Sequence, residues 1–211
     1  PVALAQVEQP PEPARLDDWI RTSFERWYTL TQELPKNVGP RFPYGYYNFN
    51  YEIRGERRQI APAQLPAVLK ASVARYTGWP PFWYPTREGI QPYPIDGAVE
   101  CWLGGDTQMS IEDRDAAHSD FWRIHSDGLA FLLRGFQEDG IDAQQARHEP
   151  VLLGKIFDVT LPVWRVGETL LQAQRLAANL FDGPTTIRFI ATYEGLSGRA
   201  LTSIDHRRLI W

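Results

Sequence analysis

The chain has 211 residues, of which 43% are hydrophobic and 23% charged, an average balance for a globular protein that can build a core. Its net charge of −4, with only short basic clusters, argues against direct nucleic-acid binding, and no apolar run has the length of a membrane helix. The single cysteine, Cys101, excludes an internal disulfide and a paired-cysteine metal site, so a cytoplasmic location is expected.

The N-terminal third of the chain combines a tail, a helix and a strand. Residues 1–14 contain four prolines and no hydrophobic period, which predicts a linker-like tail. Apolar residues then recur at three- and four-residue steps, which predicts a helix over about 16–33 that ends at Pro35. Apolar and polar residues alternate over about 45–54 and predict a half-buried strand. A single domain over 15–211 is the simplest organisation.

The central part of the chain continues this mixture. Apolar spacing over 65–76 predicts a second helix, which Gly78 would stop. Residues 98–103 are strand-like. The dipeptide Asp127-Gly128 stands between two apolar runs and is the strongest hairpin signal in the chain.

The C-terminal part predicts a strand at 151–160, a helix with an apolar face over 166–180 that ends at Gly183-Pro184, and a strand over 187–193. Residues 198–211 could pair back on that last strand. Strands at hairpin spacing predict an α+β fold, with a mainly antiparallel sheet and about three helices packed on one face. No series of alternating strands and helices supports a dinucleotide-binding fold.

The densest feature is the aromatic–proline segment, residues 76–102, which reads YTGWPPFWYPTREGIQPYPIDGAVECW. Its prolines exclude a helix or a central strand, so a stiff loop with large flat side chains is expected. Such a loop either caps a core or presents a recognition surface. The aromatic faces would suit a planar ligand, a sugar or a proline-rich peptide. The candidate contact residues are Trp79, Phe82, Trp83, Tyr84, Arg87 and Tyr93, with Glu100 and Arg134 from neighbouring strands.

Catalytic and cofactor motifs are not recognisable. The glycine-containing stretches lack phosphate-loop spacing, the serines lie in no nucleophile motif, and Cys101 alternates with apolar residues and should be buried and inert. Glu100 is expected to be an exposed strand carboxylate beside a basic residue. Neither a cofactor nor a metal is expected, and an enzyme is disfavoured. An enzyme site assembled from scattered residues stays an alternative, with the candidates His118, Asp120, His125 and Glu100.

Four long stretches carry a resemblance to a bacterial family: TGWPPFWYPTR, YPIDGAVECWLG, HSDFWRIHSDGLAFLLRGFQEDG and TLPVWRVGETL. Over about residues 19–211 the chain resembles the region that follows a Schlafen-type, AlbA-like domain in predicted regulators and ATP-binding proteins. The AlbA-like domain, to which nucleic-acid or nucleotide chemistry is attributed, is not in this chain, so no active-site residue is carried over.

The resemblance implies an accessory domain of a longer protein. It would be a non-catalytic sensor or protein-interaction domain of a bacterial regulatory or defence protein, with the aromatic–proline segment as its contact surface. Its partners would be an upstream effector domain and a protein or small-molecule ligand. An oligomerisation module, with the apolar loop at a symmetric interface of a homo-oligomer, is a further alternative.

Overall fold

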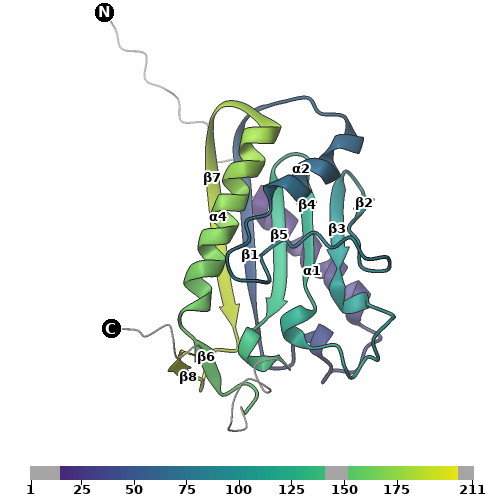
Figure 1. The fold of residues 1–211 in the computed structure, drawn as a ribbon, viewed down its shortest axis with the longest axis vertical. Coiled ribbons are helices and arrows are strands. Elements are labelled where there is room, and N and C mark those ends of the chain that lie inside the picture. Colours follow the sequence, from purple (N-terminus) through teal and green to yellow (C-terminus); the bar gives the residue numbers. More distant parts are fainter. Residues whose placement is uncertain (1–14, 141–151, 204–211) are drawn as a thin grey trace, which may run out of the picture.

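The fold is an α+β sandwich around one antiparallel sheet, seen in a computed structural model that describes residues 15–140 and 152–203 (Figure 1). The sheet has six strands in the order β2-β3-β4-β5-β1-β7. The predicted class, antiparallel sheet and three helices are confirmed. In sheet order the strands are β2 (Tyr93–Ile95), β3 (Ala98–Trp102), β4 (Phe121–His125), β5 (Leu129–Gly135), β1 (Tyr46–Arg57) and β7 (Phe181–Glu194).

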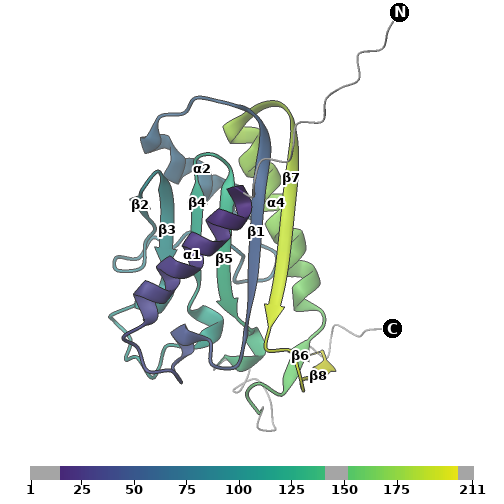
Figure 2. The same cartoon turned by 180° about the vertical axis from the view of Figure 1, so that it is seen from behind.

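The helices cover both faces of the sheet. Helices α2 (Leu65–Ser72) and α4 (Leu161–Leu180) lie on the face towards the viewer in Figure 1, here called the front face. Helix α1 (Arg15–Thr31) crosses the opposite, or back, face (Figure 2). The expectation of helices on one face was therefore wrong. The physical reason is that both faces of the central strands are apolar, so each needs a cover.

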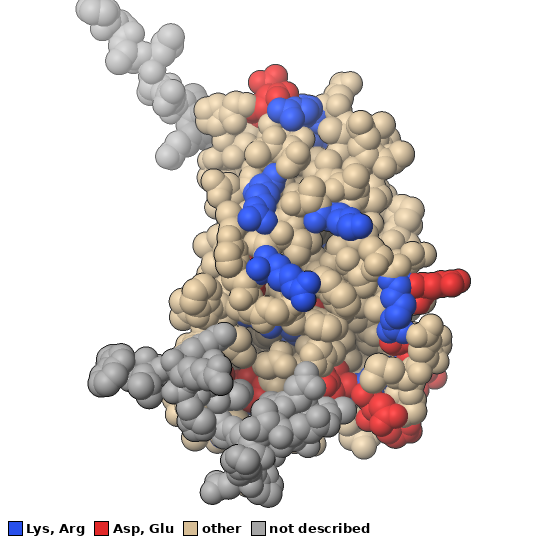
Figure 3. Space-filling view, viewed as in Figure 1, with Lys and Arg blue, Asp and Glu red and all other residues tan. Residues whose placement is uncertain are grey.

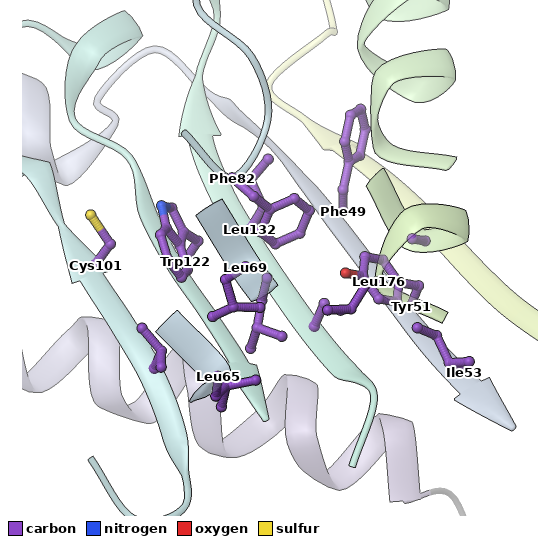
Figure 4. Packing of buried hydrophobic residues seen from close by; sticks show 14 of the residues in the cluster. Phe49, Tyr51, Ile53, Leu65, Leu69, Phe82, Cys101, Trp122, Leu132 and Leu176 are labelled. Carbon is purple, nitrogen blue, oxygen red and sulfur yellow. The ribbon is translucent and has the colours of Figure 1, made fainter. Parts of the chain in front are cut away.

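Two hydrophobic clusters, one on each face, hold the layers together. On the front face, Phe49 and Tyr51 of β1 pack with Leu69 of α2 and Leu176 of α4 (Figure 4). On the back face, Phe121, Phe131 and Leu133 pack against aromatic residues of α1. The two clusters alternate along each strand because successive strand side chains point to opposite faces.

Local patterns placed several elements correctly. The Asp127-Gly128 hairpin joins β4 to β5, with Gly128 at φ +83, a backbone conformation that glycine adopts without strain. Helix α1 and strand β1 lie where the apolar periods predicted them. Helix α2 is shorter than predicted because Glu168 of α4 accepts the backbone N–H of Thr77 at 2.8 Å, which holds the following residues outside the helix.

The end of α4 differs from the prediction. The helix stops at Leu180 and β7 begins at once, so Gly183-Pro184 lies within the strand and does not end the helix. The Leu180 carbonyl accepts the N–H of Arg58 at 2.8 Å, and Phe181 already pairs with Arg57 of β1. Pairing with β1 therefore begins where the helix ends.

Residues 198–211 were expected to pair back on β7, but the described part of this range, 198–203, does not do so. Gly195, at φ +84, turns the chain away, and β8 (Ala200–Thr202) runs parallel to β6 (Ile156–Asp158) in a separate two-stranded sheet. The predicted strand at 151–160 is reduced to β6 among the described residues. The predicted tail at 1–14 and the end of the chain, 204–211, lie outside the described residues. None of the helices in the described ranges is both long and apolar enough to span a membrane.

Candidate functional site

The aromatic–proline segment is fastened to the front face by a buried ion pair. Arg134 of β5 and Asp120, the residue before β4, are 1% and 0% exposed, and the Arg134 Nε donates to Asp120 Oδ1 at 2.6 Å. The other guanidinium nitrogens donate to the carbonyl oxygens of Trp79 (3.1 Å) and Pro80 (2.9 Å). The indole N–H of Trp79 reaches Asp120 Oδ2 at 3.3 Å. The pair therefore fixes the start of the segment on the sheet.

The ion pair keeps its charge despite full burial. Desolvation opposes the charge on Arg134, but the carboxylate of Asp120 and the hydroxyl group of Tyr47 raise the pKa of the guanidinium above its ordinary value. The guanidinium carbon also lies 6.0 Å from the centre of the Tyr47 ring. Arg134, one of the predicted contact residues, thus acts beneath the surface as an anchor.

Further contacts hold the middle of the segment. Phe82 is 1% exposed and points into the front-face cluster, where its ring lies 5.7 Å from that of Tyr51 (Figure 4). The indole N–H of Trp122 donates to the Trp83 carbonyl at 2.9 Å. Tyr84 packs half-buried against the same cluster. Phe82 therefore caps the core, which corrects its assignment to the contact surface, whereas Tyr84 stays partly exposed beside it.

Trp79 and Trp83 instead form one wall of a pocket of about 360 Å³, here called the Trp79–His118 pocket. The two indole rings are 4.3 Å apart at an angle of 54°, and the His118 ring meets Trp79 edge-on at 4.5 Å. The opposite wall comes from the loop after β3. The pocket is lined by Trp79, Trp83, Arg87, Ile90, Leu103, Asp106, Met109, Asp113, Arg114, Asp115, His118 and Ser119.

Charged groups of both signs surround this pocket. Arg87 pairs with Asp106, and its hydrogen bond holds the pKa of that carboxyl below its ordinary value. Arg114 donates to the carbonyl oxygens of Gly104 (2.9 Å) and Met109 (3.2 Å), which closes the loop on itself. In Figure 3 the acidic side chains of the front face gather at the lower right, where Figure 1 draws the loop after β3. The pocket can therefore meet a ligand's acceptors with arginine and its donors with carboxylates.

Hydroxyl and thiol groups near the pocket are not activated as nucleophiles. Ser119 is 1% exposed, and its hydroxyl donates to the carbonyl of Asp115 at 2.5 Å. Burial, with smaller contributions from Asp120 and Glu100, raises the pKa of the Cys101 thiol well above its ordinary value. The prediction of a buried Cys101 is confirmed.

Cys101 provides a test of this packing. We expect the thiol of the folded chain to resist an aromatic disulfide reagent at pH 8 and to react at once in denaturant, because a buried thiol forms little thiolate. The release of the chromophore measures both rates. Reaction of the folded chain as fast as that of the unfolded chain would show that Cys101 is not buried.

The remaining predicted contact residues lie on the back face. Glu100 is 0% exposed and binds Arg26 of α1 at 3.0 Å, Arg123 at 3.2 Å and the hydroxyl of Tyr93. The expectation of an exposed carboxylate was wrong because α1 lies over β3 and β4, although the basic neighbour is present. The predicted single surface is therefore divided by the sheet: Tyr93 and Glu100 are on one face, and Trp79 and Trp83 are on the other.

The alternative enzyme site does not assemble either. Asp120 is paired with Arg134, and His118 lines the pocket, both on the front side. His125 lies on the back face against Trp19, with ring centres 5.8 Å apart, on the same side as Glu100. Within the described ranges, no three His, Cys, Asp or Glu side chains are grouped closely enough to hold a metal ion.

Sequence reasoning named Arg87 and His118 as candidates but missed Asp106 and Arg114. Asp106 belongs to a Gly-Gly-Asp stretch that lacks phosphate-loop spacing, and Arg114 lies in a polar run without a motif. Asp115 caps the short helix at Ala116–His118 by accepting the His118 N–H at 2.9 Å, a local signal that the spacing does carry. Nothing in the spacing brings these residues to Trp79 and Trp83.

Comparison with protein-family models, with curated proteins and with solved structures finds no match to this chain. The resemblance to the bacterial regulator family stays a prediction.

Proposed function

We propose that this domain is a non-catalytic sensor that binds a small planar ligand in the Trp79–His118 pocket. The observation that carries the proposal is the pair of half-buried indoles, Trp79 and Trp83, beside the charged Arg87–Asp106 pair. The buried Arg134–Asp120 pair fixes Trp79, and the Trp122 indole fixes the backbone of Trp83. Apolar walls with a few placed polar groups are the usual composition of a ligand site.

The size of the pocket narrows the ligand class. A volume of about 360 Å³ lies at the lower end of small-molecule sites, which span roughly 300–1,000 Å³. One ring or two fused rings fit such a volume, whereas a proline-rich peptide needs a longer groove. A flat ring also uses the indole faces better than a sugar does.

Polar groups point to a nitrogen heterocycle that carries both donors and acceptors, as nucleobases do. The guanidinium of Arg87 can donate to a ring carbonyl or to an attached anionic group. The carboxylates of Asp106 and Asp113 can accept ring or exocyclic N–H groups. The backbone contacts of Trp79 and Trp83 hold both indoles before the ligand arrives, which lowers the entropic cost of binding.

In this proposal the domain is an accessory part of a bacterial regulatory or defence protein in the cytoplasm. Occupation of the pocket is the signal, and the effector domain upstream in the chain is the recipient. The aromatic–proline segment is the structure that a bound ligand would stiffen further.

Replacement of Trp83 by alanine tests the proposal by calorimetry with adenosine, guanosine, maltose and a proline-rich peptide. We expect a nucleoside to bind the wild-type chain, and Trp83→Ala to weaken that binding at least about fivefold, since stacking on an aromatic side chain contributes about 1–3 kcal/mol. Trp164→Ala is the matched control, because Trp164 is a half-exposed tryptophan of α4 outside the pocket, and it should bind as wild type.

Two outcomes would refute the proposal. One is that none of the four compounds binds the wild-type chain. The other is that Trp83→Ala and Trp164→Ala bind with the same affinity as the wild type. Binding of the peptide alone would replace the planar ligand by a protein partner.

A further inference from the structure

The outer edge of β7 is long and open. Within residues 15–140 and 152–203, β7 pairs with β1 and forms the end of the sheet (Figure 1). Its residues 187–194, IRFIATYE, contain no proline, glycine or lysine. The opposite edge of the sheet is protected, because β2 is only three residues long and contains Pro94. Edges without such protection are sites at which another strand can add.

The backbone groups that point outwards can be identified. The N–H of Ile53 donates to Gly128 O at 2.9 Å, on the β5 side of β1. Because N–H and C=O groups alternate between the two sides of a strand, Asn50 and Glu52 then face β7 and pair with Ile190 and Arg188. The intervening β7 residues, among them Ala191, therefore direct their N–H and C=O groups away from the sheet.

Antiparallel pairing of β7 with a second β7 has one register that matches the charges. With Ala191 on the two-fold axis, Arg188 lies opposite Glu194 of the second copy. The symmetry produces two such Arg188–Glu194 pairs. In the same register Phe189 faces Tyr193, and the small Ala191 meets its own copy. Arg188 has only a 3.5 Å ion pair with Asp17 in the single chain, and Glu194 is exposed. Opposite charges across a strand pair are stabilising, and like charges are destabilising.

Helix α4 presents an apolar flank over the same edge. Glu168 and Arg175 bond to residues 73–77 from one side of the helix. Leu170 lies roughly 140° around the helix from Arg175, on the side away from residues 73–77, and is 41% exposed. An exposed leucine at this position can pack against its own copy across a two-fold axis.

A shared cavity relates positions along β7 to positions along α4. Tyr193 and Arg165 line one small cavity, so they lie at the same level. Ala191 is about 7 Å further along β7, which corresponds to about four or five helix residues. An axis through Ala191 thus passes close to the level of Leu170. It sets Leu170 of one copy near Leu170 of the other.

We propose that two copies of this chain associate through their β7 edges, in the register centred on Ala191, with the α4 flanks packed together. The result is one continuous twelve-stranded antiparallel sheet. Helix α4 contacts both β1 and β7, so its axis lies about 5 Å from the two-fold. The two helices then lie about 10 Å apart, close to ordinary helix packing. The isologous contact closes on itself.

Light scattering after size exclusion tests this with the 211-residue chain. We expect a mass of twice the 24.2 kDa chain for the wild type. Ala191→Pro removes an N–H that points outwards and makes no bond inside the sheet, so the chain should fold and run as a monomer. Glu194→Arg should weaken the dimer at least tenfold, since it sets like charges opposite each other twice.

A double variant that exchanges the two charges, together with a control variant, tests the register of the β7 pair. Arg188→Glu combined with Glu194→Arg restores the opposite charges and should restore the dimer. Glu33→Arg makes the same charge change at an exposed site of the first connection and should leave the dimer unchanged. A wild-type monomer at every concentration would overturn the proposal, as would a dimer that persists in both Ala191→Pro and Glu194→Arg. Failure of the charge exchange to rescue the dimer would overturn the register.

Discussion

Replacement of Arg134 by methionine is expected to lower the free energy of unfolding by about 3–5 kcal/mol. The side chain is 1% exposed, and the change leaves the carboxylate of Asp120 buried without its cation. It also removes the donors to the carbonyl oxygens of Trp79 and Pro80, so the aromatic–proline segment loses its anchor. Urea unfolding followed by circular dichroism measures the loss.

A double variant separates the uncompensated charge from the loss of packing. Arg134→Met together with Asp120→Leu removes both charges, and such replacements of buried pairs are often neutral or stabilising. We expect the double variant to regain most of the stability that the single variant loses. The account of the anchor would be wrong if Arg134→Met alone cost less than about 1 kcal/mol, a typical value for an exposed ion pair.

Replacement of Glu100 by leucine should have the second largest effect, a loss of about 3 kcal/mol in the free energy of unfolding. Glu100 is 0% exposed and joins Arg26 of α1 to Arg123 of β4. Burial already lowers the pKa of Arg123, and Glu100 is the main group that opposes this. Without Glu100, a buried guanidinium loses its partner and α1 loses its polar tie to the sheet.

Glu25→Leu provides the matched control for this experiment. Glu25 pairs with Arg21 one turn away on the exposed side of α1, and its side chain is 62% exposed. Surface pairs of this kind contribute about 0.3–0.5 kcal/mol. Similar unfolding midpoints in urea for Glu25→Leu and Glu100→Leu would contradict the structural role given to Glu100.

Local sequence patterns predicted several elements of the fold. The Asp127-Gly128 turn, the apolar period of α1 and the alternation in β1 each depend on neighbours within a few residues, and each was found from the sequence. The face of the sheet on which α1 packs could not be found in this way. Periodicity shows which side of a helix is buried, but not which face of a sheet that side packs against. The burial of Glu100 follows from that placement.

The candidate site depends on long-range contacts more than the individual helices and strands do. The aromatic–proline segment was recognised as a stiff platform, yet which of its rings face outwards is decided by Arg134 and Asp120, 14 residues apart. Phe82 enters the core because the segment is held at that height above β5. The loop after β3 completes the pocket, and no spacing rule links it to Trp79.

The proposed function depends most on Trp79 and Trp83 as the wall of a ligand-binding pocket. Nitrogen-15 correlation spectra of the indole N–H groups, recorded while adenosine or guanosine is added, test it most directly. The account predicts that the Trp79 and Trp83 signals move together and saturate, while the signal of Trp164 on α4 stays in place. Saturable shifts of Trp164 alone, or no shift of any indole, would contradict it.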